Sequence, residues 1–251
     1  RVGQAILRDL GDAHDWRLLD REPLPRDKLP ADIDNSDVYV ADVTNKQAVA
    51  EAARGCEVII HLAGDPRPNA PWESVMRNNI DGTQTVLEAA VDVGVEQVAF
   101  ASSNHAVGSY EEERKPDIYR DHDEFRLDGT ELPRPTNLYG VSKATGETLA
   151  RYYHDEHDLS VVCVRIGNLT ESHPPRNYER GQAMWLSYTD CSHLFDCCVT
   201  ADYGYEIVYG ISDNDRKYYS IETAREVLGY EPRDNSADYH LDGTPKDDAE
   251  E

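Results

Sequence analysis

The chain has 251 residues, of which 49 are acidic and 25 are basic, so its net charge is −24. Such a surface repels nucleic acid and anionic membranes, and no apolar run approaches the roughly 20 residues of a membrane span. We therefore expect a cytoplasmic protein with neither nucleic acid nor membrane as a partner, and we interpret the charge as adaptation to a salt-loaded cytoplasm rather than as ordinary acidity.

Short apolar runs alternate with helical patterns along the chain. The apolar runs predict buried strands at residues 16–20, 37–42, 57–64, 96–103, 159–167 and 205–210. The patterns between them predict helices at residues 2–10, 45–54, 72–93, 137–156, 190–201 and 220–228. Strands that alternate with helices form a parallel sheet covered by helices on both faces. The predicted fold class is therefore α/β, with a doubly wound parallel sheet of the Rossmann type.

Three stretches interrupt this alternation. Residues 109–136 are acidic and contain prolines without a clear period, which predicts a long loop over one edge of the sheet. Residues from about 233 to 251 are acidic and poor in apolar side chains, which predicts a disordered tail. The chain opens directly on a helix, whereas a doubly wound sheet begins with a strand, so we expect a first strand upstream of Arg1.

We divide the chain into a Rossmann domain (1–166), a small substrate-covering lobe with the last strand and helix (167–232), and an acidic tail (233–251).

A dinucleotide is expected at the carboxyl ends of the predicted strands, where ligands bind in open α/β sheets. Gly3 lies at a helix N-terminus, where free N–H groups and the helix dipole favour a phosphate. Asp20 ends the first strand in view, where a carboxylate binds the adenosine ribose; this favours NAD over NADP, although Arg21 follows it. The other positions that we assign to the cofactor site are Arg1, Val2, Asp42, Val43, Leu62, Ala63, Gly64, Asn79 and Ile166.

Tyr139 and Lys143 lie four residues apart in a predicted helix, so they share one face. A tyrosine that acts as a base near neutral pH needs its pKa lowered by about 3 units. An adjacent ammonium and a nicotinamide charge can supply this shift, and a solvated surface pair is the alternative. Ser102 and Ser103 end a strong predicted strand, where a hydroxyl can orient a substrate alcohol toward Tyr139.

Four segments resemble, in order, the extended short-chain dehydrogenase/reductases of the NAD-dependent epimerase/dehydratase family: HLAG (61–64), FASSNHAVG (100–108), YGVSK (139–143) and VRIGN (164–168). The resemblance spans about residues 1–230 and is nearest to the uronate dehydrogenases and the archaeal NAD-dependent glucose-6-phosphate dehydrogenases. Both groups oxidise the C1 hydroxyl of a pyranose to a lactone. The resemblance implies a catalytic triad of Ser103, Tyr139 and Lys143, of which the last two also hold the nicotinamide nucleotide.

The same resemblance implies that Asn104 contacts the sugar and that Arg180 grips its anionic group, unless Arg180 forms a surface salt bridge with Glu179 or Glu171. Pro66 and Asn168 stand where the uronate dehydrogenases carry serines, and Arg67 follows Pro66. We assign Ser103, Asn104, Arg67, Asn168 and Arg180 to the substrate site, which leaves room for a uronate, a sugar phosphate or a neutral aldose.

We therefore expect an NAD-dependent dehydrogenase that oxidises C1 of a small, anionic sugar and that assembles as a homodimer or larger homo-oligomer. The alternatives are a sugar epimerase of the same family and a non-catalytic NAD(P)-binding sensor. The five cysteines form no CxxC pair and no ligand cluster is evident, so we expect neither a disulfide framework nor a metal site.

Overall fold

A four-stranded parallel sheet forms the centre of the structure, a computed structural model that describes residues 1–26, 29, 33–119, 124–171, 173–176, 178–240, 242 and 244–246. Its strands, in spatial order, are β3 (Val58–His61), β4 (Gln97–Ser103), β5 (Ser160–Ile166) and β8 (Tyr205–Gly210). Two further parallel pairs are β1 (Leu18–Asp20) with β2 (Val38–Val40), and β6 (Asn168–Thr170) with β7 (Trp185–Ser187). The predicted α/β class with a parallel sheet is confirmed, whereas the β6–β7 pair was not predicted.

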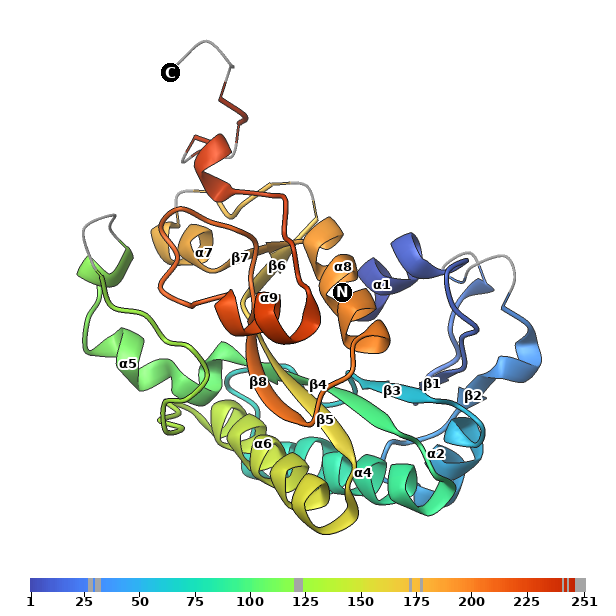
Figure 1. Cartoon of the computed structure of the whole chain (residues 1–251). Coiled ribbons are helices and arrows are strands. Elements are labelled where there is room, and N and C mark those ends of the chain that lie inside the picture. Colours follow the sequence, from blue (N-terminus) through green and yellow to red (C-terminus); the bar gives the residue numbers. More distant parts are fainter. Residues whose placement is uncertain are drawn as a thin grey trace.

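Helices cover both faces of the four-stranded sheet (Figure 1). One face is covered by α4 (Gly82–Val93) and α6 (Leu138–His157), with α2 (Lys46–Ala53) beside α4. The other is covered by α1 (Val2–Leu10), α8 (Tyr188–Thr200) and α9 (Glu222–Leu228). The helix predicted at 72–93 consists of three successive parts: α3 (Trp72–Ser74), a π-helical segment (Val75–Asp81) and α4.

Alternate side chains of the central strands enter two apolar cores. Val98 and Phe100 of β4 pack in the core that contains Leu87 of α4, whereas Ala99 packs in the core that contains Leu194 of α8. Because both faces of the sheet are buried, the strands read as continuous apolar runs in the sequence. In the parallel register of β4 and β5, Ser103 lies opposite Ile166, so both strands end at the same edge.

The segment predicted as a loop at 109–136 contains more regular structure than expected. A 3₁₀ turn (Asn104–Val107) leads into α5 (Gly108–Glu112), and a second 3₁₀ turn (Asp117–Tyr119) follows. Farther along, Glu131 accepts hydrogen bonds from Arg165 of β5 and from Tyr209 of β8. Arg165 is fully buried and forms a two-point ion pair with Glu147 of α6, with both N–O distances at 2.9 Å. This buried network attaches the segment to the sheet.

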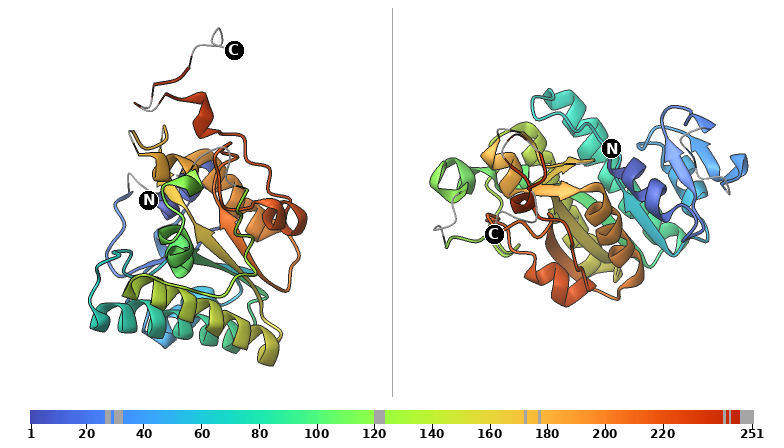
Figure 2. Two further views of the ribbon diagram at one scale, coloured as in Figure 1. Left: turned by 90° about the vertical axis from the view of Figure 1, so that its left-hand side faces the viewer. Right: turned by 90° about the horizontal axis from the view of Figure 1, so that it is seen from above.

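The β6–β7 pair lies beyond the carboxyl end of β5, from which only Gly167 separates it. Figures 1 and 2 place α5 and α7 (Glu179–Ala183) at this same end of the molecule.

The prediction of a disordered tail is wrong for residues 233–240. The Asp190 carboxylate accepts hydrogen bonds from the amides of Arg233 (2.8 Å) and Asp234 (3.1 Å). A 3₁₀ turn (Ser236–Asp238) follows, while positions 241, 243 and 247–251 of the predicted tail lie outside the described residues. Among the helices of the described chain, none combines the length and the apolar character needed to cross a bilayer.

Candidate active site

Ser103 and Tyr139 lie where β4 ends and α6 begins. Ser103 is the last residue of β4, and Tyr139 is the second residue of α6. The helix begins after Asn137, whose side-chain oxygen caps the Gly140 amide at 2.8 Å. A Cβ atom on Gly140 would lie 2.2 Å from the backbone oxygen of His105, so only glycine allows α6 to start this close to the turn that follows Ser103. The sequence thus fixes where the phenol stands relative to the strand end.

Ser103 acts on the pKa of Tyr139. Burial raises that pKa above its ordinary value, and Ser103 opposes the shift without cancelling it. The Ser103 hydroxyl also lies 3.2 Å from Oδ1 of Asn104, which is itself buried. The strand end therefore presents a hydroxyl, an amide and a phenol within one small region.

Lys143 lies one helical turn after Tyr139, as predicted, but its ammonium is directed toward the backbone of β4 rather than toward the Tyr139 hydroxyl. Nζ donates to the backbone oxygen of Ala101 at 2.7 Å and lies 5.7 Å from the centre of the Tyr139 ring. Burial lowers the pKa of Lys143 from 10.5 to about 8. The predicted lowering of the Tyr139 pKa by this lysine is thus not present in the structure, because the lysine hydrogen bonds to the strand and desolvation of the phenol dominates.

The residues assigned to the cofactor lie at the N-terminus of α1 and at successive strand ends. Arg1 and Val2 flank the start of α1, and a Cβ atom on Gly3 would lie 3.4 Å from the Leu62 side chain, so α1 begins beside the end of β3. Asp20 ends β1 with an exposed carboxylate. A helix N-terminus next to the end of β3, together with an exposed carboxylate at the end of β1, fits the phosphates and the adenosine ribose of NAD.

The remaining cofactor positions are placed as follows. Ala63 and Gly64 follow β3, and Ile166 lies opposite Ser103 in the register of β4 and β5. Val43 packs closely against α4, since a Cβ atom on Gly82 would lie 2.8 Å from its side chain. Asp42 is held by the Thr44 hydroxyl at 2.7 Å and by Arg77 at 3.0 Å. These contacts fix the loops at the ends of β2, β3 and β5.

Asn79 holds protein groups rather than presenting a free amide. It is 2% exposed, and its Oδ1 accepts from the Asp65 amide at 2.6 Å. Its Nδ2 donates to the Asp65 carbonyl at 3.1 Å and to the Ser142 hydroxyl at 2.9 Å. Asn79 therefore positions the β3 loop against α6, and its contact with the cofactor stays a prediction.

The residues assigned to the substrate are only partly brought together. Nδ2 of Asn104 lies 3.4 Å from the sulfur of Met184, and the backbone oxygen of Met184 accepts from the Asn168 amide at 2.8 Å, so these three residues are neighbours. Arg67 instead forms a two-point ion pair with Asp65, at 2.9 and 2.6 Å. Its guanidinium is therefore already neutralised by a carboxylate from the same loop.

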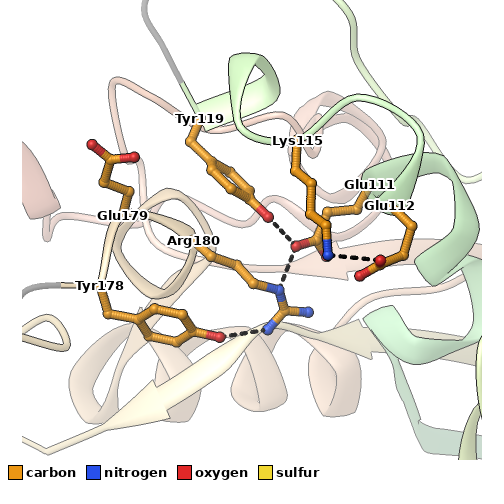
Figure 3. A pocket seen from close by; sticks show the side chains of 7 residues that line it. All are labelled: Glu111, Glu112, Lys115, Tyr119, Tyr178, Glu179 and Arg180. Atoms are coloured by element: carbon orange, nitrogen blue, oxygen red, sulfur yellow. Dashed lines mark hydrogen bonds and ion pairs between the residues drawn. The ribbon is translucent and has the colours of Figure 1, made fainter.

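Arg180 lines a pocket of about 720 Å³ next to this region (Figure 3). The lining residues are Glu111, Glu112, Lys115, Tyr119, Tyr178, Glu179 and Arg180. Nε of Arg180 donates to the buried carboxylate of Glu111, and the Tyr119 hydroxyl donates to the same carboxylate oxygen. Neither Glu179 nor Glu171 is its partner, so the surface salt bridge considered from the sequence is replaced by a pair with Glu111 of α5. No sequence pattern indicates this pair, because Glu111 lies in a stretch without a period.

His105 contacts Tyr139 and lies close to Arg180 and Glu111 of this pocket. Its ring packs edge-on against the Tyr139 ring, with 5.6 Å between the ring centres. Burial lowers the pKa of His105, Arg180 lowers it further, and Glu111 acts in the opposite direction. Arg180 and Glu111 are thus close enough to act on the residue that contacts Tyr139.

Comparisons with known proteins agree with this geometry. The chain is 72% identical over 250 residues to a protein of Haloferax volcanii named NAD-dependent glucose-6-phosphate dehydrogenase, with 99% of this chain and 95% of the relative covered. It is 37% identical over 215 residues to L-arabinose 1-dehydrogenase (NAD(P)(+)) of the same organism, with 80% of this chain and 84% of the relative covered. The source of these relatives fits the salt adaptation interpreted from the charge.

Among solved structures, a mutant of uronate dehydrogenase from Agrobacterium tumefaciens complexed with NAD superposes with a TM-score of 0.79 and 30% identity, covering 100% of this chain and 88% of that one. The sequence profile described as the NAD dependent epimerase/dehydratase family matches residues 1–187. The fold, the Ser–Tyr–Lys arrangement and these matches agree, and the chain belongs to the NAD dependent epimerase/dehydratase family as an enzyme that depends on NAD.

Proposed function

We propose that this chain oxidises the C1 hydroxyl of a small sugar to a lactone and that its substrate is glucose 6-phosphate. The observation that carries the chemistry is the placement of Ser103, at the carboxyl end of β4, beside Tyr139 of α6, with Lys143 one helical turn away. The choice of sugar is supported by the 72% identity to a glucose-6-phosphate dehydrogenase over nearly the whole chain.

In the proposed reaction, Tyr139 acts as the general base. Its phenolate takes the proton of the C1 hydroxyl while Ser103 holds that hydroxyl in place, and C1 loses a hydride as its bond to oxygen becomes a carbonyl. When bound, NAD supplies the hydride acceptor and a positive charge near the phenol. The residues that would hold it are Gly3 at the start of α1, Asp20 after β1, and Tyr139 with Lys143 on α6.

A positive charge near Tyr139 matters because burial alone raises its pKa. Each unit by which a nearby charge lowers this pKa corresponds to about 1.4 kcal/mol of preferential stabilisation of the phenolate. Lys143 does not act on this pKa in the structure, because its ammonium donates to the Ala101 carbonyl, so the proposed reaction requires the positive charge of NAD for the lowering.

A neutral aldose is a second candidate substrate. The observation that favours it is the ion pair between Arg180 and Glu111, which neutralises the arginine expected to hold an anionic group. A relative named L-arabinose 1-dehydrogenase supports the same alternative.

The test is a substrate panel in high salt. The chain is incubated with NAD and, separately, with glucose 6-phosphate, glucose, L-arabinose, glucuronate and galacturonate, while NADH absorbance is followed and the product is identified by NMR. We expect glucose 6-phosphate to give the highest kcat/KM and the lactone to be the first product. Higher kcat/KM for a neutral aldose would select the second candidate, and the absence of NADH with every sugar would refute both.

A further inference from the structure

Arg180 meets the pocket with its Nε and one N–H of Nη1 already engaged (Figure 3). A guanidinium binds a carboxylate at two points either side-on, through Nε and one Nη, or end-on, through both Nη atoms. Here Nε donates to Glu111 and Nη1 donates to the Tyr178 hydroxyl at 3.3 Å. The side-on geometry, which needs Nε, is therefore closed to an incoming carboxylate. The end-on geometry keeps an N–H on each Nη atom, but the charge that it offers is already balanced by Glu111.

The Glu111 carboxylate is held firmly in this position. The residue is 3% exposed, and the Tyr119 hydroxyl donates to the same oxygen that accepts from Arg180. Tyr119 is anchored in turn by its ring contact with the fully buried Tyr218, with 5.9 Å between the ring centres. An anion that enters the pocket must displace a carboxylate that already accepts from Arg180 and Tyr119, or must bind end-on to an arginine whose charge is already balanced.

We propose that Glu111 determines substrate specificity by withholding Arg180 from sugar acids, so that the enzyme discriminates against uronates. This inference rests on the proposed function and deepens it.

A phosphate ester is less affected by this arrangement than a carboxylate. It has three terminal oxygens, so that an end-on contact with Arg180 still leaves an oxygen for another donor. It is also attached through an additional oxygen, whereas a uronate carboxylate is bonded directly to the sugar ring. Glu111 therefore separates two classes of anionic sugar that share the same ring.

Glu111→Gln tests the inference because it removes the charge and keeps the shape. We expect the ratio of kcat/KM for glucuronate to kcat/KM for glucose 6-phosphate to rise at least tenfold, mainly through a lower KM for glucuronate. Activity with neutral glucose should change less than twofold. Glu113→Gln is the matched control: Glu113 follows α5 and pairs with Arg134 outside the pocket, so this variant should leave the ratio unchanged.

A second variant keeps the inference falsifiable if Glu111→Gln does not fold. Tyr178→Phe releases Nη1, and Tyr178 is 45% exposed, so folding should not depend on its hydroxyl. In this variant the ratio of kcat/KM for glucuronate to kcat/KM for glucose 6-phosphate should rise at least threefold. If Glu111→Gln folds and its ratio is unchanged, the inference is overturned while the proposed function stands. If Glu111→Gln does not fold, an unchanged ratio in Tyr178→Phe overturns the inference in the same way. No NADH from any sugar with the wild-type chain overturns the proposed function and the inference with it.

Discussion

Replacing Lys143 with methionine should abolish activity and, at neutral pH, stabilise the folded chain. Lys143 is 5% exposed, and burial lowers its pKa from 10.5 to about 8. At about 1.4 kcal/mol per pKa unit, the buried ammonium destabilises the native state by roughly 3 kcal/mol at pH 7. Methionine removes this cost but leaves the Ala101 carbonyl without its donor, a loss of about 1–2 kcal/mol. The expected net gain at pH 7 is therefore about 1–2 kcal/mol.

The pH dependence of this gain identifies its cause. As the pH rises through about 8, the native state loses the Lys143 proton while the unfolded chain keeps it up to about 10.5. The unfolded state then binds more protons, so the stability of the wild type rises with pH, by about 2 kcal/mol between pH 7 and pH 9.5. The methionine variant lacks this contribution, and its advantage over the wild type should shrink by the same amount.

The assay is chemical denaturation of both proteins at constant high salt, at pH 7 and at pH 9.5, with NADH formation measured in parallel. Lys46→Met serves as the control, since Lys46 lies at the surface with Glu88 and Asp92, and its effect should not follow this pH profile. A Lys143→Met protein that is less stable than the wild type at pH 7, or a difference that does not vary with pH, would refute the reasoning.

Three further predictions concern the reaction, the cofactor and the buried network. Tyr139→Phe should lower kcat roughly 1,000-fold while NAD binding, measured by calorimetry, is retained; a rate above a tenth of the wild type would exclude Tyr139 as the base. Asp20→Ala should narrow the preference for NAD over NADP in kcat/KM, and a wild type that prefers NADP would contradict the role of Asp20. Glu147→Gln should cost about 3–5 kcal/mol of unfolding free energy, because it leaves the charge of Arg165 buried without a full partner; a cost below 1 kcal/mol in denaturant titrations would show that Glu131 alone suffices.

The sequence predicted the strands of the sheet well for a physical reason. Buried parallel strands are apolar on both faces, so each strand of the central sheet appeared as an uninterrupted run, and residues at the ends of those runs were candidates for the site. The i, i+4 spacing of Tyr139 and Lys143 required only one helix to be placed. By contrast, the break of the helix at 72–93 into α and π parts changes no apolar period, and nothing in the sequence distinguished it.

Long-range pairings of polar side chains were the part that the sequence did not reveal. Arg180 was expected to meet a substrate or a neighbouring glutamate, but its partner Glu111 lies 69 positions away. The direction of the Lys143 ammonium, toward a backbone carbonyl of β4, likewise depends on the distance between a helix and a strand. Such contacts follow from tertiary packing, and a single sequence carries no periodic signal for them.

The buried network of Arg165, Glu147 and Glu131 limits how new specificities can be built on this scaffold. The segment that carries Glu111 toward the pocket is the same one that carries Glu131 to the sheet. A chimera that exchanges this segment for that of a relative would replace the selectivity residue and the anchor together. If the donor segment brings no carboxylate to the place of Glu131, Arg165 is left only partly neutralised. The chimera is then destabilised, and its selectivity cannot be measured on a folded protein. Glu131 should therefore be retained when this segment is transplanted.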